Sequence, residues 1–353
     1  ARKSPVCRHK CQPAMNRPQY SVIVPAYNAE CTIGACVAAL CAQSFDQSYE
    51  IIVIDDGSTD GTAAVARAAG ARVITTPNGH PAAARNAGIR AASGGIICCT
   101  DADCIPHADW LRHITAPFAD TDIVACKGSY ATQQTELVAR FVQLEYEDKY
   151  DLLRSEKYID FIDTYSAAYR RKVLLECGGF DERFDYLEDQ ELSFRLAAQG
   201  YKMVFQPTAV VEHLHSDSLR AYLRKKQTIG YWKAQVVRRF PERAVRDSHT
   251  PQVMKIQMVL SMMLVGLVGL VVLGLGVAML YPARWGVAGW LYLLPAEIVG
   301  LIFVATTLPF VRKAWLKDRA VALVSPLLLL GRALALSMGY ASGILRPRRF
   351  GPD

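Results

Sequence analysis

The sequence predicts an α/β domain with a doubly wound, Rossmann-like sheet, followed by an α-helical transmembrane region. Three observations predict this fold class. Apolar segments of strand length alternate with helical segments at the start of the chain. Acidic or turn residues stand at the ends of these strands, where open α/β sheets bind ligands. Apolar runs that approach or exceed the ~20 residues needed to cross a bilayer dominate the C-terminal part.

Strands and helices alternate regularly in the first part of the chain. The predicted strands are Tyr20–Val24, Glu50–Ile54, Arg72–Thr75 and Gly95–Thr100. Helices are predicted at about Glu30–Ala42, after the capping residues Ser58–Asp60, and at Pro81–Ala92, which has proline in its first turn. Such alternation implies parallel βαβ units. The later predicted elements are a strand at Ile123–Cys126, helices at Leu137–Leu153 and Leu187–Gln199, a loop at Phe180–Phe184, and short apolar segments at Met203–Phe205 and Ala209–Val211.

Composition divides the chain into regions. Charged and apolar residues mix up to about Pro251, and apolar residues dominate from Val253 onward. We therefore expect an N-terminal tail (1–18), a catalytic domain (19–215), basic juxtamembrane helices (216–252), a transmembrane region (253–345) and a C-terminal tail (346–353). The apolar runs of the transmembrane region are Ile256–Leu280, Gly286–Phe310 and Ala320–Leu345.

The net charge of +7 is concentrated, because basic residues gather between Arg220 and Arg246. Cytoplasmic segments beside membrane helices are rich in lysine and arginine, which predicts a cytoplasmic position for this cluster. Contact with anionic lipid headgroups is a sharper alternative. Nucleic acid is not an expected partner, because no aromatic-interleaved RNA motif or recognition helix is evident.

The N-terminal residues and the cysteines both predict a cytoplasmic catalytic domain. Ala1–Cys11 is basic and polar with no apolar core after it, so no cleavable signal is expected. We expect an integral protein of the plasma (inner) membrane. In that reducing compartment the ten cysteines would be small core hydrophobes rather than disulfides. Zinc binding by Cys7, His9 and Cys11 is disfavoured, because three tightly spaced candidates are too few.

Asp101 and Asp103 stand one residue apart at the end of an apolar strand. Their carboxylates can converge on Mg²⁺ or Mn²⁺, which neutralises the charge of a departing diphosphate. The same pattern also fits an ordinary polar turn. The metal site is favoured because three other polar segments precede it at ordered intervals, namely Ser21–Asn28, Ile51–Asp60 and Ala84–Gly88.

Together these four segments resemble the nucleotide-sugar-binding half of an inverting family 2 glycosyltransferase with a GT-A fold, and the resemblance covers roughly the first 240 residues. It implies that Asp103 binds the metal directly, that Asp101 faces ribose or phosphate, and that Asp56 binds the nucleobase. For Asp55 and Asp56 a helix-capping turn is the alternative. The donor-binding residues implied by the resemblance are Pro25, Tyr27, Asn28, Asp55, Asp56, Arg85 and Asp101.

Two further donor-side assignments carry alternatives. Arg85 is expected to contact the nucleotide or diphosphate, against the alternative of a surface ion pair. His213 matches the third metal ligand of many GT-A folds, although His215 is an equal chemical candidate.

Gly178–Phe184 and Glu188–Leu192 resemble the acceptor side of the same family. The resemblance assigns the general base to Asp189, since an acceptor hydroxyl attacks well only after a carboxylate removes its proton. The expected acceptor-side residues are Gly178, Gly179, Glu188 and Trp232. Trp232 ends the segment Gln227–Trp232, which has glycine where processive synthases have arginine, so processive polymerisation is not expected. Trp232 would stack on a sugar or lie at the membrane interface.

Three membrane crossings create a conflict of charge. They would put Arg312–Arg319 inside, as the positive-inside rule requires, but Arg346, Arg348 and Arg349 outside. Either the last apolar segment returns as a hairpin or the rule is overridden. Glu297 and Arg332 lie within apolar segments, where charges are costly, and are expected to pair across helices. The alternative is that Arg332 meets a lipid phosphate.

These observations predict a membrane-anchored, metal-dependent glycosyltransferase. It would move a sugar with inversion from a nucleotide-sugar donor to a hydroxyl of a lipid-linked or glycolipid acceptor, with Mg²⁺ or Mn²⁺ as cofactor. Membrane lipids are the other expected partners. One alternative is transfer to a polyprenyl phosphate, whose anionic acceptor needs no base. The other is a non-catalytic membrane scaffold, which the retained acidic residues disfavour.

Overall fold

The computed structural model describes residues 18–245, 247–248, 250–280 and 288–348. They form two compact units. The first unit consists of residues up to Gln134 and of Lys149–His215, with a short segment at Asp247. The second consists of Thr135–Asp148, Ser216–Arg246 and the chain from Thr250 onward. Cys7, His9 and Cys11 lie outside the described residues.

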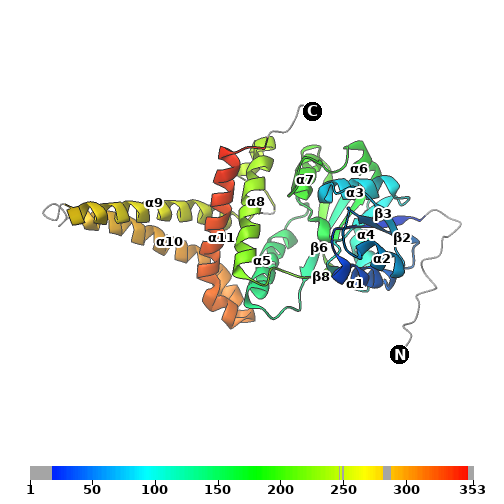
Figure 1. Ribbon diagram of the computed structural model, residues 1–353, viewed down its shortest axis with the longest axis horizontal. Helices are drawn as coiled ribbons and strands as arrows, with labels where there is room; N and C mark the ends of the chain where they lie inside the picture. Colours follow the sequence, from blue (N-terminus) through cyan, green and yellow to red (C-terminus); the bar gives the residue numbers. More distant parts are fainter. Residues whose placement is uncertain (1–17, 246, 249, 281–287, 349–353) are drawn as a thin grey trace. The chain divides into compact units, whose positions relative to one another are not determined.

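An eight-stranded mixed sheet forms the centre of the first unit (Figure 1), in the order β3-β2-β1-β4-β7-β6-β8-β5. The strands are β1 (Tyr20–Ala26), β2 (Tyr49–Asp55), β3 (Arg72–Thr75), β4 (Ile96–Cys99), β5 (Cys104–Pro106), β6 (Ile123–Ala131), β7 (Ala167–Arg170) and β8 (Lys202–His213). Strands β1 to β4 are mutually parallel. Strand β7 runs antiparallel to β4 and β6, and β5 runs antiparallel to β8.

Short helices connect these strands. They are α1 (Glu30–Cys41), α2 (Thr62–Ala68), α3 (His80–Ala91), α4 (Trp110–Thr115), α6 (Arg171–Glu176) and α7 (Glu188–Ala198), with 3₁₀ turns at Ala116–Ala119 and Thr164–Ser166. The central strands are buried almost continuously, as in sheets covered on both faces. Val22, Ile23 and Val24 of β1, for example, have no exposed surface.

The sequence correctly predicts the first four strands and the helices between them, within two residues at most ends. It misses β5, β7, α4 and α6, which are three to six residues long. The predicted parallel arrangement holds for β1 to β4 and for the β6–β8 pair, whereas β7, between β4 and β6, and β5 run antiparallel to their neighbours. The predicted segments Met203–Phe205 and Ala209–Val211 belong to one strand, β8. Its register against β6 shifts around Gly128. The polar residues at that shift hide the continuity of the strand.

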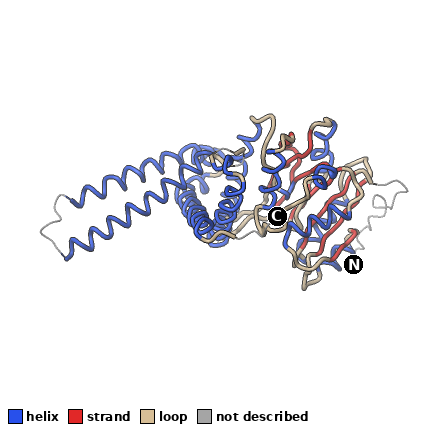
Figure 2. Tube along the Cα trace, turned by 90° about the horizontal axis from the view of Figure 1, so that it is seen from above, coloured by secondary structure: helices blue, strands red, loops and turns tan. Residues whose placement is uncertain are grey.

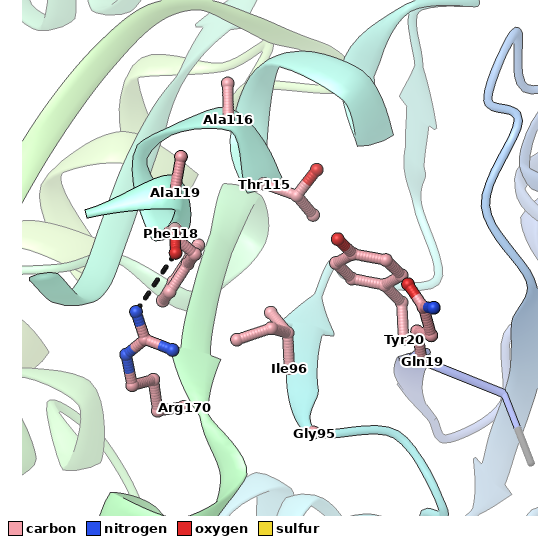
Figure 3. A pocket seen from close by; sticks show the side chains of 9 residues that line it. All are labelled: Gln19, Tyr20, Gly95, Ile96, Thr115, Ala116, Phe118, Ala119 and Arg170. Carbon is pink, nitrogen blue, oxygen red and sulfur yellow. Dashed lines mark hydrogen bonds between the residues drawn. The ribbon is translucent and has the colours of Figure 1, made fainter. Parts of the chain in front are cut away.

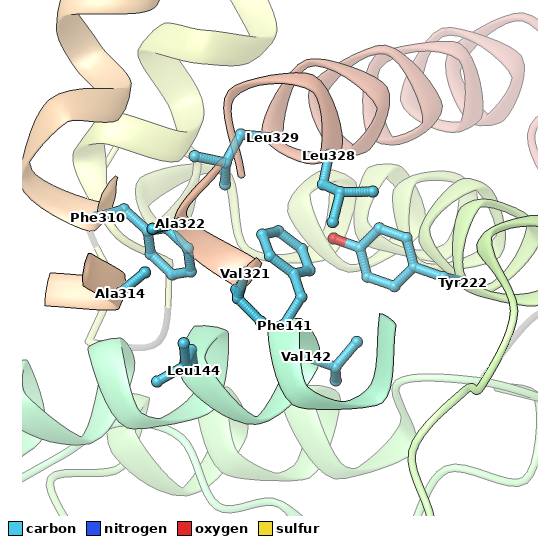
Figure 4. Packing of buried hydrophobic residues seen from close by; sticks show 10 residues of the cluster. All are labelled: Phe141, Val142, Leu144, Tyr222, Phe310, Ala314, Val321, Ala322, Leu328 and Leu329. Atoms are coloured by element: carbon cyan, nitrogen blue, oxygen red, sulfur yellow. The ribbon is translucent and has the colours of Figure 1, made fainter. Parts of the chain in front are cut away.

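The second unit is helical. Helix α5 (Leu137–Arg154) begins in it, and α8 (Leu219–Arg239), α9 (Gln252–Leu280), α10 (Ala288–Lys317) and α11 (Arg319–Leu345) complete it, with a 3₁₀ turn at Pro241–Ala244. Residues 135–148, which the sequence places in the catalytic domain, pack in this unit. Figure 4 shows the reason: Phe141 and Leu144 of α5 lie among Tyr222, Phe310 and Leu329, which come from three other helices.

Three helical segments are long and apolar enough to cross a membrane: Gln252–Gly276, Leu293–Lys317 and Arg319–Leu345. They match the three predicted apolar runs, except that the start of the second run lies outside the described residues. Helices α9 and α10 pack side by side as a hairpin (Figure 2). Helix α11 contacts both of them and packs most extensively along α8.

The expected pairing of Arg332 with Glu297 is wrong. Arg332 is buried and donates from Nη1 to Glu145 Oε1 of α5 at 2.7 Å and from Nη2 to Gln257 Oε1 of α9 at 2.6 Å. Glu145 also accepts from Tyr222 at 3.0 Å, so its carboxylate is surrounded by donors. Arg332 therefore has a structural role between helices, but its acid comes from α5 rather than from the neighbouring apolar helix.

Candidate active site

Asn28 ties together the first two loops at the carboxyl edge of the sheet. It follows β1 with a φ of 48°, a left-handed conformation that asparagine tolerates better than most residues. Its backbone N–H donates to Ser58 Oγ at 3.0 Å, and its side-chain oxygen accepts from the Thr59 N–H at 2.9 Å. Asn28 thus positions the loop that follows Asp55 and Asp56.

The buried carboxylates of Asp55 and Asp56 differ in how many of their oxygens accept hydrogen bonds. Asp55 accepts on both oxygens, from the Ser58 N–H at 3.2 Å and from the Thr75 hydroxyl at 3.4 Å. Asp56 accepts only on Oδ1, from two donors in the turn after β3 at 3.0 and 3.1 Å. Among the described residues nothing donates to Asp56 Oδ2. This difference favours Asp56 as the nucleobase-binding residue and gives Asp55 a role in shaping the loop.

Arg85 connects the donor and acceptor motifs. Its guanidinium, on α3, is 5% exposed and donates to Asp101 Oδ1 at 2.9 Å and to Glu188 Oε1 at 2.5 Å. Burial lowers the pKa of Arg85, but the two carboxylates outweigh that effect and the net pKa is raised. The alternative of a surface ion pair is wrong, because this ion pair is buried. Arg85 instead holds the Asp-x-Asp turn against the start of α7.

Asn86, next to Arg85, fixes the loop that precedes α7. Its side chain accepts from the Phe180 N–H at 2.9 Å and donates to the Phe180 carbonyl at 2.8 Å. The loop passes Asn86 at Gly179, where an added Cβ would lie 2.4 Å from the Asn86 side-chain oxygen. Gly178 and Gly179 both have positive φ, of 82° and 74°. The two glycines are therefore required by backbone geometry, whatever they contribute to an acceptor.

Asp189 lies in the first turn of α7, beside Glu188. Its Oδ1 accepts from the Gln190 N–H at 2.7 Å. Burial raises the pKa of Asp189 well above its ordinary value, and the negative charges of Glu188 and Asp163 raise it further against the opposing charge of Arg85. A carboxylate with a raised pKa is a stronger base, as proton abstraction requires.

Asp103 and His213 form the core of a candidate metal site. Strand β5 pairs with β8 so that Cys104 lies opposite His213, and this register brings Asp103 Oδ2 to 3.6 Å from His213 Nε2. One ligand atom each of Asp103, Cys104 and His213 lies within 4.8 Å of the others. Burial and nearby acids raise the pKa of the Cys104 thiol well above its ordinary value, which disfavours the thiolate. The carboxylate and imidazole that remain suit Mg²⁺ or Mn²⁺.

The structure distinguishes His213 from His215. His213 belongs to the cluster with Asp103, whereas the backbone N–H of His215 donates to Gln134 at 2.5 Å and its ring meets Tyr130 edge-on. This arrangement favours His213 as the ligand.

The other predicted site residues lie in different places. Pro25 pairs with Ile54 inside the sheet, and Tyr27 is 52% exposed at the end of β1. Trp232 belongs to the second unit, where it is buried with the Arg348 guanidinium 5.1 Å from its ring centroid. Its role as an acceptor-side residue stays a prediction.

Sequence reasoning missed Asp163 and Tyr186, which interact electrostatically with Asp189, and Lys127, the partner of Asp163. Lys127 of β6 is 1% exposed, pairs with Asp163 and lies 4.9 Å from the centroid of the Phe161 ring. Tyr186 has its pKa raised by burial and by the charges of Asp189 and Glu188. A lysine inside an apolar strand was a visible signal for a buried ion pair, but nothing in the sequence marked Asp163 as its partner.

A separate pocket of about 520 Å³ lies at the opposite edge of the sheet, near the starts of β1 and β4 (Figure 3). Among the described residues that line it, Arg170 alone is charged. The Arg170 guanidinium donates to the carbonyls of Phe118, Asp120 and Ile123 at 2.8–3.1 Å. Those bonds are structural, and none of the predicted site residues lines the pocket.

Residues 21–178 match the family model described as glycosyl transferase family 2. The chain carries a glycosyl transferase family 2 domain. The match spans the Asp56, Arg85 and Asp101–Asp103 segments and ends at Gly178, just before the loop that Asn86 holds.

Curated relatives of this glycosyltransferase domain come from bacteria and archaea. A pre-mycofactocin glycosyltransferase of Mycobacterium tuberculosis is 26% identical over 235 residues, which are 63% of this chain and 48% of that protein. Glycosyltransferase AglE of Haloferax volcanii is 27% identical over 238 residues, covering 62% of this chain and 74% of that protein. The chain thus spans about half the length of the mycobacterial relative.

A solved structure shares the fold over nearly the whole chain. A mannosyltransferase of Pyrobaculum calidifontis, in complex with GDP-Man and Mn²⁺, has a TM-score of 0.58 at 20% identity. The similarity covers 94% of this chain and 88% of that one. The fold is therefore a GT-A, Rossmann-like domain followed by helices long and apolar enough to span a membrane.

Proposed function

We propose that this protein is an inverting glycosyltransferase that moves a sugar from a nucleotide-sugar donor to a hydroxyl of a lipid-linked or glycolipid acceptor. The observation that carries the proposal is the double ion pair of Arg85. It joins Asp101, in the predicted donor motif, to Glu188, the neighbour of the predicted base. Because one buried side chain links both motifs, donor and acceptor groups belong to one site.

The donor-binding residues are assigned from the polar side chains at the strand ends. Asp56 Oδ2 would accept a hydrogen bond from the nucleobase, since Oδ1 is already held by the turn after β3. Asp103 and His213 would hold Mg²⁺ or Mn²⁺, which neutralises charge on the diphosphate leaving group when bound. The structure of a fold neighbour with GDP-Man and Mn²⁺ bound is consistent with this assignment.

The acceptor side supplies the base. The acceptor hydroxyl would give its proton to Asp189 as its oxygen bonds to the anomeric carbon. The bond from that carbon to the diphosphate oxygen breaks, and the nucleoside diphosphate leaves. Attack from the opposite face inverts the configuration of the sugar. The raised pKa of Asp189 suits this role.

The choice of a hydroxyl acceptor rests on the same carboxylate. A polyprenyl phosphate is already anionic and needs no base at neutral pH, so Asp189 would have nothing to do in that reaction. We further propose that the apolar helices place the enzyme in the plasma membrane with the glycosyltransferase domain in the cytoplasm, where nucleotide sugars are made.

Donor cleavage by the purified full chain in lipid tests the proposal. The panel is UDP-, GDP- and dTDP-sugars with Mg²⁺ or Mn²⁺, with and without lipid extract as acceptor. Release of one nucleoside diphosphate that is lost in Asp103→Asn and retained in Asp46→Asn supports the enzyme, because Asp46 is exposed and remote from the motifs. Absence of both turnover and metal-dependent nucleotide binding would support the scaffold alternative.

Asp189→Asn separates the two acceptor classes. With a hydroxyl acceptor, this variant should bind donor normally and lose transfer. Undiminished transfer to a polyprenyl phosphate by Asp189→Asn would contradict the hydroxyl assignment and favour the lipid-phosphate alternative.

A further inference from the structure

Helix α9 is apolar on all sides beyond its first turns, and α10 is apolar except at exposed Glu297 and at the basic residues of its last two turns. Large apolar side chains of α9, such as Val259, Val272 and Leu273, are 61–65% exposed, and only 6% of its candidate span is buried within the protein. Leu301 of α10 is 70% exposed in the same way. A helix that is apolar all round cannot lie with one side in water, so it must be surrounded by hydrocarbon. The hairpin therefore has to enter the bilayer.

Helix α11 differs from α9 in its burial, because half of its candidate membrane-spanning segment is buried within the protein. Apart from Ile344 at its C-terminal end, its large exposed apolar residues form a narrow stripe rather than a full circumference. Leu323 and Leu327 are 72% and 74% exposed, Met338 is 57% exposed and Leu345 is 80% exposed. Half-exposed Leu330, Leu334 and Ala341 fall between them. These positions are three or four residues apart, so they lie along one face for the whole length of the helix.

The side of α11 opposite to this stripe packs closely against α8. Added Cβ atoms at Gly230 of α8 and Gly339 of α11 would lie 2.2 and 2.0 Å from the carbonyl oxygens of Leu336 and Gln227. Gln235 of α8 donates to the Gly343 carbonyl at 2.9 Å. Only glycine permits this approach of two backbones, which also explains the glycine in the segment Gln227–Trp232. The two helices thus form one rigid pair.

The α8–α11 pair runs crosswise to the α9–α10 hairpin. Within the second unit, Figure 1 shows α8 and α11 side by side and the hairpin projecting away from them, and Figure 2 shows the same projection from another direction. If α9 and α10 cross the bilayer, α11 must lie along its surface. The reverse assignment would lay the all-round apolar hairpin along the interface, where one side of it would meet water.

Charge supports the same orientation. The exposed residues of α8 include Arg220, Arg224, Lys225, Arg238 and Arg239. A surface-lying α11 also places Arg319, at its start, and Arg348, after its end, on the same side of the membrane. This removes the conflict that three crossings create for the positive-inside rule.

We propose that the chain crosses the membrane twice, through α9 and α10, and that α11 lies in the plane of the leaflet with its leucine-rich stripe in the acyl chains. We assign the phospholipid leaflet as the partner of this stripe, because the stripe lies on the side of α11 away from α8, and the apolar hairpin projects from that same side (Figure 1). The inference does not depend on the proposed catalysis. Helix α11 is about 40 Å long at 1.5 Å per residue, so it forms an extended contact with the membrane surface.

Depth measurements along α11 test this orientation. Nitroxide labels are placed singly by Leu323→Cys, Leu334→Cys and Leu345→Cys in the full chain, in vesicles of phosphatidylethanolamine and phosphatidylglycerol. Cys7, Cys11, Cys31 and Cys177 are first replaced by serine, because the six remaining cysteines are buried. Collision rates with oxygen and with a water-soluble nickel chelate then report depth.

The two orientations give different depth profiles. In a surface-lying helix the three labels share one depth within about 5 Å, a single helical turn. In a spanning helix the middle label lies about 16 Å deeper than the other two, because eleven residues separate it from each. Labels at Val253, near the start of α9, and at Val265, near its middle, serve as the matched control; both side chains are exposed, and the labels should differ in depth by about 18 Å.

A second measurement identifies the side of the C-terminus. Tags at the two chain ends should be cut by protease from the same side of sealed vesicles if the chain crosses twice. Tags on opposite sides, or a middle α11 label that is markedly deeper than its neighbours, would overturn the proposal. Water exposure of all three labels would also overturn it, because the stripe would then be covered by something other than lipid.

Discussion

Arg85→Met should destabilise the glycosyltransferase domain far more than loss of an ordinary surface arginine. The guanidinium is 5% exposed and pairs with two carboxylates, of which Glu188 is 9% exposed and Asp101 is 33% exposed. Breaking a buried pair by removing one partner typically costs 3–5 kcal/mol. The partial exposure of Asp101 weakens its share, so we expect a loss of about 3 kcal/mol.

The loss should depend on pH in a defined direction. Burial already raises the pKa of Glu188, and Arg85 opposes that rise. Without Arg85 the pKa rises further, so ionising Glu188 in the folded state becomes more costly. Below the ordinary glutamate pKa the carboxyl is neutral in both folded and unfolded chains and the extra cost vanishes. The stability deficit of Arg85→Met should therefore grow as the pH rises through the folded-state pKa of Glu188, which lies above the ordinary glutamate value.

Thermal unfolding of the purified protein measures both effects. A loss of about 3 kcal/mol corresponds to a fall of roughly 6–12 °C in Tm for a domain of this size. Arg72→Met is the matched control, since Arg72 pairs with Glu50 at 3.5 Å and is 55% exposed. Equal Tm values for the two variants at neutral pH, or a deficit that shrinks as pH rises, would refute the assignment of Arg85 as the buried link.

Three further predictions concern the base, the metal and the helix pair. Because Asp189 must be ionised and its pKa is raised, the transfer rate should fall as the pH drops through a value above the ordinary aspartate range. A pH–rate profile measures this fall on the acidic side. His213→Ala should raise the Mn²⁺ concentration needed for half-maximal nucleotide binding at least tenfold, whereas Cys104→Ser should leave it nearly unchanged, as titrations of nucleotide fluorescence would report. Gly339→Leu should cost at least 1–3 kcal/mol by forcing α8 and α11 apart, whereas Gly266→Leu, with open space around it, should leave Tm nearly unchanged.

The sequence predicts well those strands and site residues that a local residue pattern determines. Strands β1 to β4 are short apolar runs that end in turn chemistry, and Asp101 and Asp103 mark the last of them. Their meeting at one edge follows from parallel pairing alone. Strands β5 and β7 have three and four residues, too few to show a period. The antiparallel register that brings Asp103 to His213 depends on β5, so the sequence favoured His213 only by resemblance, with His215 as a chemically equal alternative.

Charged residues far apart in sequence were harder to assign, because burial selects their partners. Arg85 was expected to bind the donor, and its partner Glu188 lies 103 residues away. Arg332 was paired with an acid in another apolar segment, whereas its partner Glu145 lies 187 residues away on a helix of mixed composition. In both cases an arginine is buried where two secondary-structure elements pack together. Its partner is whichever acidic residue the neighbouring element brings within hydrogen-bond distance. Composition shows that a buried charge needs a partner, but only the packing shows which residue supplies it.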